Sequence, residues 1–291
     1  MPPSHQSAPM KSDKHSGFID IHSHILPFLD DGAENYAQCL AAAGWYLSAG
    51  INQVIATPHC IPGTKWEPTP EQIGESIQQV EKILEEQNLP LKILPGMEIM
   101  LTENICRNFA PDRFLSLGGK GFYLIELPFD SGLSTPFAEG LQRLPLVENI
   151  HFVIAHPERC KVFTDNRGLL EQLVGQGMLT QVNIDSVLGL AGQKVQQNAL
   201  EFLQAGWVHF LASDTHARDG RMPPDKRKIA QLSNLLGKET TVHALQLNPQ
   251  RLLSGKRVDP IIPDGNIRFL TQLYAQQGGY MQKLKKIFIR H

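Results

Sequence analysis

Short apolar runs alternate with longer stretches of helical periodicity along most of the chain. The apolar runs cover residues 18–24, 53–59, 91–98, 121–126, 151–156, 178–185 and 207–214. Helical spacing covers residues 34–49, 69–88, 102–110, 134–148, 165–176 and 193–205, and a last helix ends at 248–255. Apolar strands separated by helices are typical of a parallel sheet whose outer face is covered by helices. Seven such units favour a closed or nearly closed barrel, so we predict a single, distorted (β/α)7-type barrel resembling a TIM barrel.

Ionisable side chains follow six of the seven predicted strands. They are His22 with His24, His59, Glu98, Glu126, His156, and Asp214 with His216. In barrels of parallel strands, the active site lies at the carboxyl ends of the strands. One such residue is more often a solvated strand end than a ligand, but six coincidences favour a common site. The sixth strand ends in polar Asn183 and offers only Asp185 nearby.

The first strand ends in the sequence Asp20-Ile21-His22-Ser23-His24. Because side chains alternate between the two faces of a strand, His22 and His24 point the same way. Neutral imidazole is the commonest metal-binding side chain, so this pair could grip one ion. Asp20 shares that face, and we predict that it accepts a ring N–H and thereby fixes a tautomer from outside the ligand set.

Composition and charge restrict the class of protein. A net charge of −2 over 291 residues gives no basic field of the kind that binds nucleic acid. No apolar run reaches the roughly 18 residues that span a bilayer, and residues 1–17 lack the apolar centre of a signal peptide. The cysteines are widely spaced without a C-x-x-C pair, which favours reduced thiols. These features predict a cytoplasmic globular protein.

The mixture of histidines and carboxylates suits Mn, Fe or Zn and argues against a structural zinc site built of cysteines. The candidates exceed what one ion needs, so two or three ions that share carboxylates are expected. With three divalent ions, the four acids of the site leave a net charge of about +2, which attracts a phosphate dianion. Those acids are Asp31, Glu98, Glu126 and Asp214. Alone, Asp30 and Asp31 before Gly32 would be interpreted as turn formers.

Two arginines stand close in sequence to these residues. Arg159 lies three positions after His156, and Arg221 lies five positions after His216. The planar guanidinium matches two oxygens of a phosphate, so we predict that both arginines bind a phosphoryl group. Away from such a site, surface salt bridges would be the favoured interpretation.

Cysteine-dependent hydrolysis of phosphate esters requires a C-x5-R loop. Cys160 is followed by Arg167 and Cys106 by Arg113, each one residue too far. A G-x-S-x-G elbow, a P-loop and an H-E-x-x-H motif are also missing from the sequence. Hydroxide bound to metal ions is the remaining nucleophile, because coordination lowers the pKa of water from 15.7 towards about 7.

Several motifs, in unbroken order over residues 18–255, resemble the PHP (polymerase and histidinol phosphatase) superfamily. They read D-I-H-S-H, D-D-G, T-P-H, G-M-E, I-E-L-P-F, A-H-P-E-R and A-S-D-T-H. D-D-G after H-x-H, H-P-E-R and the ending S-D-x-H…G-R are most similar to bacterial manganese-dependent tyrosine phosphatases of capsule and exopolysaccharide operons. The resemblance implies a (β/α)7-type barrel with three divalent ions, Mn first, with Fe or Zn as alternatives.

The resemblance also implies a role for each residue. His22, His24, Glu98 and Asp214 would hold the first ion, Glu98, Glu126 and His156 the second, and Asp31, His59 and His216 the third. Arg159 and Arg221 would bind the phosphate, while a hydroxide that bridges the first two ions attacks phosphorus. The implied substrate is a phosphotyrosyl protein, such as the tail of a membrane tyrosine kinase of polysaccharide synthesis or export.

Two departures from the family pattern leave the substrate preference open. Cys60 follows His59, and the sixth strand reads Gln181-Val182-Asn183-Ile184-Asp185-Ser186, which concerns the pocket wall rather than the ligands. Histidinol-phosphate phosphatase, or another small-molecule phosphomonoesterase, therefore remains an alternative. A non-catalytic metal-binding regulator of a kinase is another, which the complete ligand and arginine sets oppose.

We expect three regions along the chain: an N-terminal tail at 1–17, the catalytic barrel at 18–256 and a C-terminal extension at 257–291. Residues 269–289 of the extension have apolar positions at helical spacing, and basic residues accompany them. These are Lys283, Lys285, Lys286 and Arg290. The plainer interpretation is a helix that packs on its own domain or on a second subunit of a homo-oligomer. A basic amphipathic helix can also contact an anionic membrane.

Overall fold

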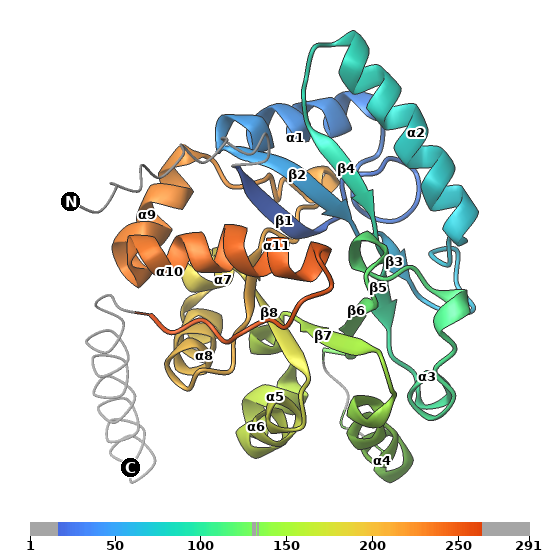
Figure 1. Cartoon of the computed structure of the whole chain (residues 1–291), viewed down its shortest axis with the longest axis vertical. Coiled ribbons are helices and arrows are strands. Elements are labelled where there is room, and N and C mark those ends of the chain that lie inside the picture. The colour runs from blue at the N-terminus through green and yellow to red at the C-terminus, as the bar shows by residue number, and fades with distance from the viewer. Residues whose placement is uncertain (1–16, 130–131, 133, 264–291) are drawn as a thin grey trace, which may run out of the picture.

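The computed structural model describes residues 17–129, 132 and 134–263. All its strand pairs are parallel and form two sheets, ordered β1-β2-β4 and β3-β5-β6-β7-β8-β9 (Figure 1). The strands are β1 Phe18–Ser23, β2 Ile51–Ala56, β3 His59–Cys60, β4 Lys92–Pro95, β5 Glu98–Met100, β6 Phe122–Glu126, β7 His151–Ala155, β8 Leu179–Asn183 and β9 Phe210–Ala212. The helices are α1 Tyr36–Ser48, α2 Pro70–Glu86, α3 Glu103–Arg107, α4 Thr135–Arg143, α5 Lys161–Asp165, α6 Arg167–Gly175, α7 Ile184–Val187, α8 Gln193–Gln204, α9 Lys226–Leu236, α10 Lys238–Val242 and α11 Asn248–Leu253.

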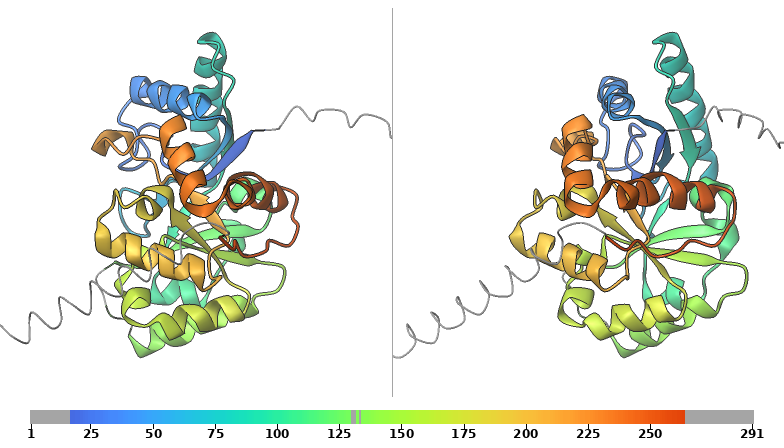
Figure 2. Two further views of the ribbon diagram at one scale, coloured as in Figure 1. Left: turned by 90° about the vertical axis from the view of Figure 1, so that its left-hand side faces the viewer. Right: turned by 60° about the vertical axis from the view of Figure 1, so that its left-hand side comes forward.

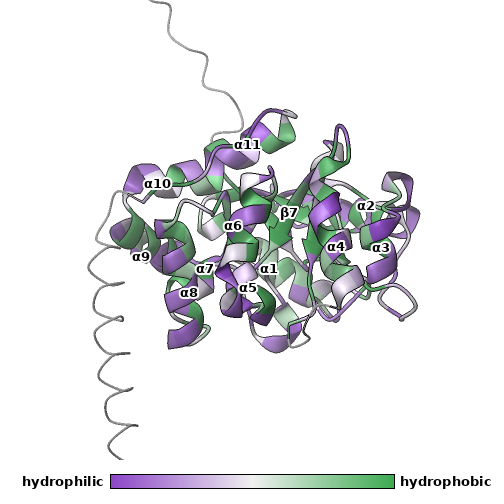
Figure 3. Cartoon of the chain, turned by 90° about the horizontal axis from the view of Figure 1, so that it is seen from below, coloured by the Kyte–Doolittle hydropathy of each residue, from purple (hydrophilic) through white to green (hydrophobic). Residues whose placement is uncertain are grey.

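Helices surround the strands, as the two turned views show (Figure 2). Seen from below, strand β7 is apolar after its first residue, His151, and the helices carry hydrophilic outer faces (Figure 3). Helix α2 illustrates the local cause. The side chains of Thr69 and Gln72 cap each other's backbone N–H groups at its start, and an apolar stripe is buried beneath it. That stripe consists of Ile73, Ile77, Val80 and Leu84.

The buried apolar residues form two clusters. The larger cluster joins strand residues such as Val54 and Ile125 to helix residues such as Ala43 and Leu203. The smaller cluster collects strand residues from both sheets, among them Ile21, Ile55, Phe122, Leu124, Val153 and Phe210. The strands therefore pack one face against the helices and the other face against strands of the opposite sheet, as expected for parallel sheets buried on both faces.

Two predicted strands are each divided in the structure. The run 53–59 becomes β2 and β3, which are separated at Thr57 and Pro58, and the run 91–98 becomes β4 and β5. Pro58 has no N–H to donate to a ladder, but its carbonyl accepts from Glu98 N at 3.1 Å. The halves pair in different sheets, and the second pairing aligns His59 directly with Glu98.

The two sheets approach each other again beside β1. Ser23 and Thr215 form an isolated parallel bridge. His24 N donates to Thr215 O at 3.0 Å, and Asp214 N donates to His22 O at 3.0 Å. The prediction of an α/β fold with parallel strands is confirmed. Within the described residues these are single bridges rather than a continuous ladder, so the closed barrel stays a prediction.

Other predictions concern the two ends of the chain. The N-terminal tail, apart from Gly17, and the helix at 269–289 lie outside the described residues. Across residues 17–263, leaving out 130, 131 and 133, no helix has the length and apolar character needed to cross a bilayer.

The predicted strand 178–185 is shorter than expected, because α7 begins at Ile184 and takes Asp185 into its first turn.

The close approach at the break between β4 and β5 requires a glycine. A Cβ on Gly96 would lie 2.8 Å from Ile55 Cγ2 and 3.2 Å from Ala56 O. We therefore expect Gly96→Ala to lower the free energy of unfolding by about 1–3 kcal/mol, as overpacked sites do. Urea unfolding measures this loss.

Gly74→Ala is the matched control for that variant. Gly74 lies within α2, and a Cβ added there would meet no other atom within 4 Å. Alanine is the better helix former by roughly 1 kcal/mol, so this variant should be as stable as the parent or more so. Equal stability of Gly96→Ala and the parent would refute the packing argument.

Candidate metal centre

The predicted ligands converge at the carboxyl ends of the strands. His22 lies near the end of β1, His24 and Asp31 follow it, His59 begins β3, Glu98 begins β5, Glu126 ends β6, His156 follows β7, and Asp214 and His216 follow β9. Strand alternation explains the placement in β6. Phe122 and Leu124 belong to the cluster between the sheets, and Glu126 is the next residue on that face. The sequence therefore aims this carboxylate at the interior.

The four residues expected at the first ion lie close together, with one ligand atom each of Glu98 and Asp214 near the Nε2 atoms of His22 and His24. His22 Nε2 and His24 Nε2 lie 3.2 Å apart. They are 3.4 and 3.3 Å from Glu98 Oε2, and each is 3.6 Å from Asp214 Oδ1. Donors about 2.1 Å from a tetrahedral ion are separated by about 3.4 Å. The atoms of His22, His24 and Glu98 are therefore spaced as ligands of a single ion would be, and Asp214 Oδ1 lies at a similar distance from both histidines.

The residues expected at the second ion adjoin this group through Glu98. Its other oxygen, Oε1, lies 2.9 Å from His156 Nε2, and that nitrogen lies 3.6 Å from Glu126 Oε1. The two oxygens of Glu98 thus face two different groups of donors. This is the geometry that a carboxylate bridging two ions requires.

The third group surrounds Asp31. Its Oδ1 atom lies 3.5 Å from His59 Nε2 and 3.3 Å from His216 Nε2. The ring of His216 also stacks on that of His24, with 3.9 Å between centroids. His59 reaches further than expected, because its Nδ1 atom lies 2.9 Å from Glu98 Oε2. The three groups therefore form one continuous cluster.

Several buried atoms of this cluster have no hydrogen-bond partner. They are Asp31 Oδ1, His59 Nδ1, Glu98 Oε2, Glu126 Oε2 and His216 Nε2. A buried polar atom without a partner costs about 1–3 kcal/mol, so native proteins rarely gather several in one place. Nitrogen and carboxylate donors in this density fit divalent cations. The residues present therefore suit the ions that the sequence predicts.

The carboxylates of the cluster repel one another where cations do not separate them. Burial, together with the charges of Glu98 and Asp214, raises the pKa of Glu126 to about 9. Although burial alone would raise it, the imidazole of His216, whose Nε2 lies 3.3 Å from Asp31 Oδ1, lowers the pKa of Asp31 to about 2. A bound divalent ion is the largest local charge and favours the ionised form of every carboxylate beside it.

Asp30, which its sequence context alone would mark as a turn former, orients a ligand. Its Oδ2 atom lies 2.6 Å from His24 Nδ1 and accepts from His59 N at 2.9 Å. Its Oδ1 atom accepts from Gly32 N at 2.9 Å. Carboxylates commonly fix metal-binding histidines in this way. The two adjacent acids before Gly32 were the sequence signal for a role of Asp30 beyond the turn, because a turn needs only one acidic residue.

The prediction that Asp20 accepts a ring N–H is wrong. Its carboxylate accepts the backbone N–H groups of His22 and Ser213, at 3.2 Å for each bond to Oδ1. Irregular pairing of β1 between Asp20 and Ser23 breaks the simple alternation on which the prediction relied. The partner of His22 Nδ1 is instead Gln181 Oε1, at 2.8 Å.

Strand β8 contributes amides, and none of the predicted ligands, to the site. Gln181 Nε2 donates to Asn183 Oδ1 at 2.8 Å, and Asn183 Nδ2 donates to Asp214 Oδ2 at 2.8 Å. A chain of amides therefore connects His22 with Asp214. The sequence predicted these residues only as part of the pocket wall and gave no sign of this role, because neutral amides carry no ligand signal.

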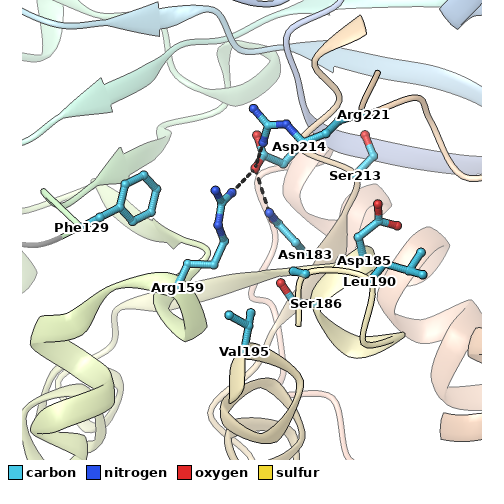
Figure 4. A pocket seen from close by; sticks show the side chains of 11 residues that line it. Phe129, Arg159, Asn183, Asp185, Ser186, Leu190, Val195, Ser213, Asp214 and Arg221 are labelled. Atoms are coloured by element: carbon cyan, nitrogen blue, oxygen red, sulfur yellow. Dashed lines mark hydrogen bonds and ion pairs between the residues drawn. The ribbon is translucent and has the colours of Figure 1, made fainter. Parts of the chain in front are cut away.

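The two arginines meet at the same carboxylate oxygen. Arg159 Nη1 donates to Asp214 Oδ2 at 2.8 Å, and Arg221 Nη1 does so at 3.3 Å (Figure 4). A pocket of about 450 Å³ opens beside them. Asp214 thus divides its oxygens, with Oδ1 facing the histidines and Oδ2 facing the arginines. The arginines lie within one side chain of the predicted ligands.

Two of the predicted ligands hold unusual backbone conformations. His156 has φ of 32° and Asp214 has φ of 52°. Positive φ in a residue with a Cβ costs about 1–3 kcal/mol and persists only where the surroundings enforce it. Asp214 is held by its N–H bond to His22 O. Strain of this kind concentrates at functional sites.

A parallel α/β fold with histidines and carboxylates gathered at its strand ends defines the class of metal-dependent hydrolases. The chain belongs to the capsular polysaccharide synthesis family CpsB/CapC, which its sequence matches over residues 18–254. The predicted resemblance is therefore confirmed at the level of the family.

Named relatives support the same assignment. Tyrosine-protein phosphatase YwqE of Bacillus subtilis strain 168 is 36% identical over 198 residues, which are 68% of this chain and 77% of that protein. Tyrosine-protein phosphatase CpsB of Streptococcus pneumoniae is 28% identical over 240 residues, covering 81% of this chain and 98% of that protein. A crystal structure from work on YwqE and CpsB as metal-dependent tyrosine phosphatases matches with a TM-score of 0.75 and 33% identity, over 84% of this chain and 98% of that one.

The raised pKa of Glu126 has a consequence for the metal-free protein. The folded protein binds the proton of Glu126 more tightly than the unfolded chain does, and this stabilises the folded state. The stabilisation is fully present below the ordinary pKa of 4.5 and is lost as the pH rises through about 9. Glu126→Gln removes this dependence. In a chelator, its free energy of unfolding should therefore rise relative to the parent between about pH 5 and about pH 9, as urea unfolding measures.

The control is Glu75→Gln on the exposed side of α2. The difference in free energy of unfolding between this variant and the parent should be the same at about pH 5 and about pH 9. A pH-independent difference for Glu126→Gln as well would contradict the raised pKa.

The contact between Asp30 and His24 predicts an effect on metal affinity. Asp30→Asn removes the charge that orients the imidazole, so we expect manganese to bind about 10–100-fold more weakly. Competition with a chromogenic chelator measures the affinity. Asp165→Asn, at an exposed position of α5, should leave it unchanged. An unaltered affinity in Asp30→Asn would show that this carboxylate does not support the ligand.

Proposed function

We propose that the chain is a metal-dependent protein-tyrosine phosphatase that hydrolyses phosphotyrosine on proteins. The observation that carries this proposal is the shared position of Asp214, between the histidine and carboxylate cluster and the two arginines. Bound divalent ions supply a nucleophile near neutral pH, because they lower the pKa of water from 15.7 to about 7. Arg159 and Arg221 bind the phosphoryl oxygens and offset the charge that develops on them.

The proposed ligands follow the groups in space. His22, His24, Glu98 and Asp214 hold the first ion, Glu98, Glu126 and His156 the second, and Asp31, His59 and His216 the third. We propose manganese for these ions, with iron or zinc as alternatives of the same ligand preference. The unpartnered oxygens of Glu98, Glu126 and Asp31 support this assignment.

The proposed substrate is a phosphotyrosyl protein. The names of the relatives and their family, capsular polysaccharide synthesis, support this class. Within it, we propose a membrane tyrosine kinase of polysaccharide synthesis or export, dephosphorylated from the cytoplasm. Tyrosyl oxygen is also a suitable leaving group, because a phenol with a pKa of about 10 needs less acid assistance than an alkyl alcohol.

We propose residues 18–256 as one catalytic unit in which the two sheets complete a (β/α)7-type barrel. The bridge between Ser23 and Thr215 and the hydrogen bonds of His24 and Asp214 beside it support this closure. Strands β2 and β3 would then act as one barrel position, as would β4 and β5.

Small aminoalkyl phosphates, such as histidinol phosphate, fit the pocket less well. An ammonium group would need an available carboxylate. Among the described lining residues, Asp214 Oδ2 already accepts from three donors, and Asp185 Oδ1 lies 2.7 Å from Lys228 Nζ. The pocket therefore favours a phosphate ester whose organic part is uncharged.

The test is turnover of a phosphotyrosyl peptide beside histidinol phosphate by the manganese-loaded protein. We expect the peptide to be the better substrate. His156→Ala should lower kcat/KM at least about 100-fold, because it removes a proposed ligand of the second ion. His151→Ala, at the opposite and exposed end of β7, should keep the parental activity. Preference for histidinol phosphate would overturn the proposed substrate, and full activity in His156→Ala would overturn its ligand role.

A further inference from the structure

The pocket beside Arg159 and Arg221 has a second, apolar end. Leu190, Ala191 and Val195 line it from the connection between α7 and α8 and from the first turns of α8. Figure 4 shows Leu190 beside Asp185, Val195 below Ser186 and Phe129 to the left of Arg159. Leu190 is 61% exposed, although it is a large aliphatic residue. Its side chain therefore contributes little to the core.

Backbone interactions hold Leu190 in this exposed position. Leu190 N donates to Asp185 O at 2.9 Å, and Gly192 N donates to Gly189 O at 3.2 Å. Gly189 has φ of 81°, and a Cβ there would lie 2.9 Å from the side chain of Gln196. Gln196 Nε2 in turn donates to Val187 O at 3.0 Å. The loop is thus fixed by its own contacts, and Leu190 lines the pocket although its side chain is largely exposed.

The cationic end of the pocket is similarly fixed. The guanidinium carbon of Arg159 lies 5.0 Å from the ring centroid of Phe129, a cation–π contact. Its Nη1 atom is anchored on Asp214 Oδ2. The two arginines therefore mark where a phosphoryl group binds, and the aliphatic wall marks where the organic part of the ester lies.

We propose that Leu190 and Val195 form the binding site for the aromatic ring of the phosphotyrosyl side chain, and so select aryl over alkyl phosphates. The identity of the ring as a tyrosyl ring rests on the proposed function. The pocket matches the two parts of such an ester: the arginines face the phosphoryl group, and uncharged aliphatic side chains face the ring. Asp185 does not disturb this match, because it is paired with Lys228.

The test compares the binding of phenylphosphonate and methylphosphonate by calorimetry, with and without manganese. These probes are not hydrolysed, so the readout is independent of activity. The parent should bind phenylphosphonate about 10-fold more tightly than methylphosphonate. Leu190→Ala should bring this ratio of affinities to one by weakening the binding of phenylphosphonate, with the affinity for methylphosphonate unchanged. The same variant should raise KM for a phosphotyrosyl peptide about 10-fold, with inhibition by inorganic phosphate unchanged.

Two variants serve as controls. Leu190→Met should retain the ratio, because it keeps the apolar contact. Leu146→Ala removes another exposed leucine, which precedes β7 at the other end of the strands, and should have no effect. Both leucines are exposed at the surface, so the loss of either side chain should leave the core intact and folding should not confuse the comparison.

The outcomes separate this inference from the proposed function. An unchanged ratio in Leu190→Ala would overturn the ring site, even if the peptide is hydrolysed. A ratio lost in Leu190→Ala, in a protein that leaves the phosphotyrosyl peptide intact, would support the aryl site and overturn phosphotyrosine as the substrate. A parent that binds both phosphonates equally would also overturn the ring site.

Discussion

The whole site depends on the burial of carboxylates that face one another. Glu98, Glu126 and Asp214 are at most 3% exposed, and their oxygens approach a common set of imidazoles. Burying ionised groups is expensive unless each is paired. The histidines satisfy part of this demand, and several of the remaining oxygens, such as Glu126 Oε2, lack a hydrogen-bond partner. The fold therefore holds a concentration of negative charge that only protons or cations can offset.

Asp214 connects the two halves of the chemistry. One of its oxygens faces His22 and His24, and the other accepts from Arg159, Arg221 and Asn183. Because the same rigid carboxylate serves both sides, the arginines keep a defined distance from the donor cluster. The positive φ of Asp214 indicates that its backbone is constrained to serve this position.

The sequence was informative where a physical period controls the outcome. The position of Glu126 at the carboxyl end of a predicted strand predicted its place in the site, and the alternation of strands and helices predicted the parallel fold. It failed where pairing partners decide the geometry. The local pattern of β1 could not reveal its irregular register with β2, which turned Asp20 towards backbone N–H groups. Nor does the turn context alone distinguish Asp30 from Asp31, which the family resemblance assigned to the third ion, since adjacent acids in a turn differ only in what the completed fold places beside them.

The division of the strands into two sheets gives the donor cluster a mechanical role. His22 lies on β1 of the three-stranded sheet, whereas Glu98 lies on β5 of the six-stranded sheet. An ion shared by this pair would cross-link the two sheets at their open ends, where single bridges otherwise join them. Bound ions would then hold the two sheets together, and the rigidity of the molecule would depend on how fully the metal sites are occupied.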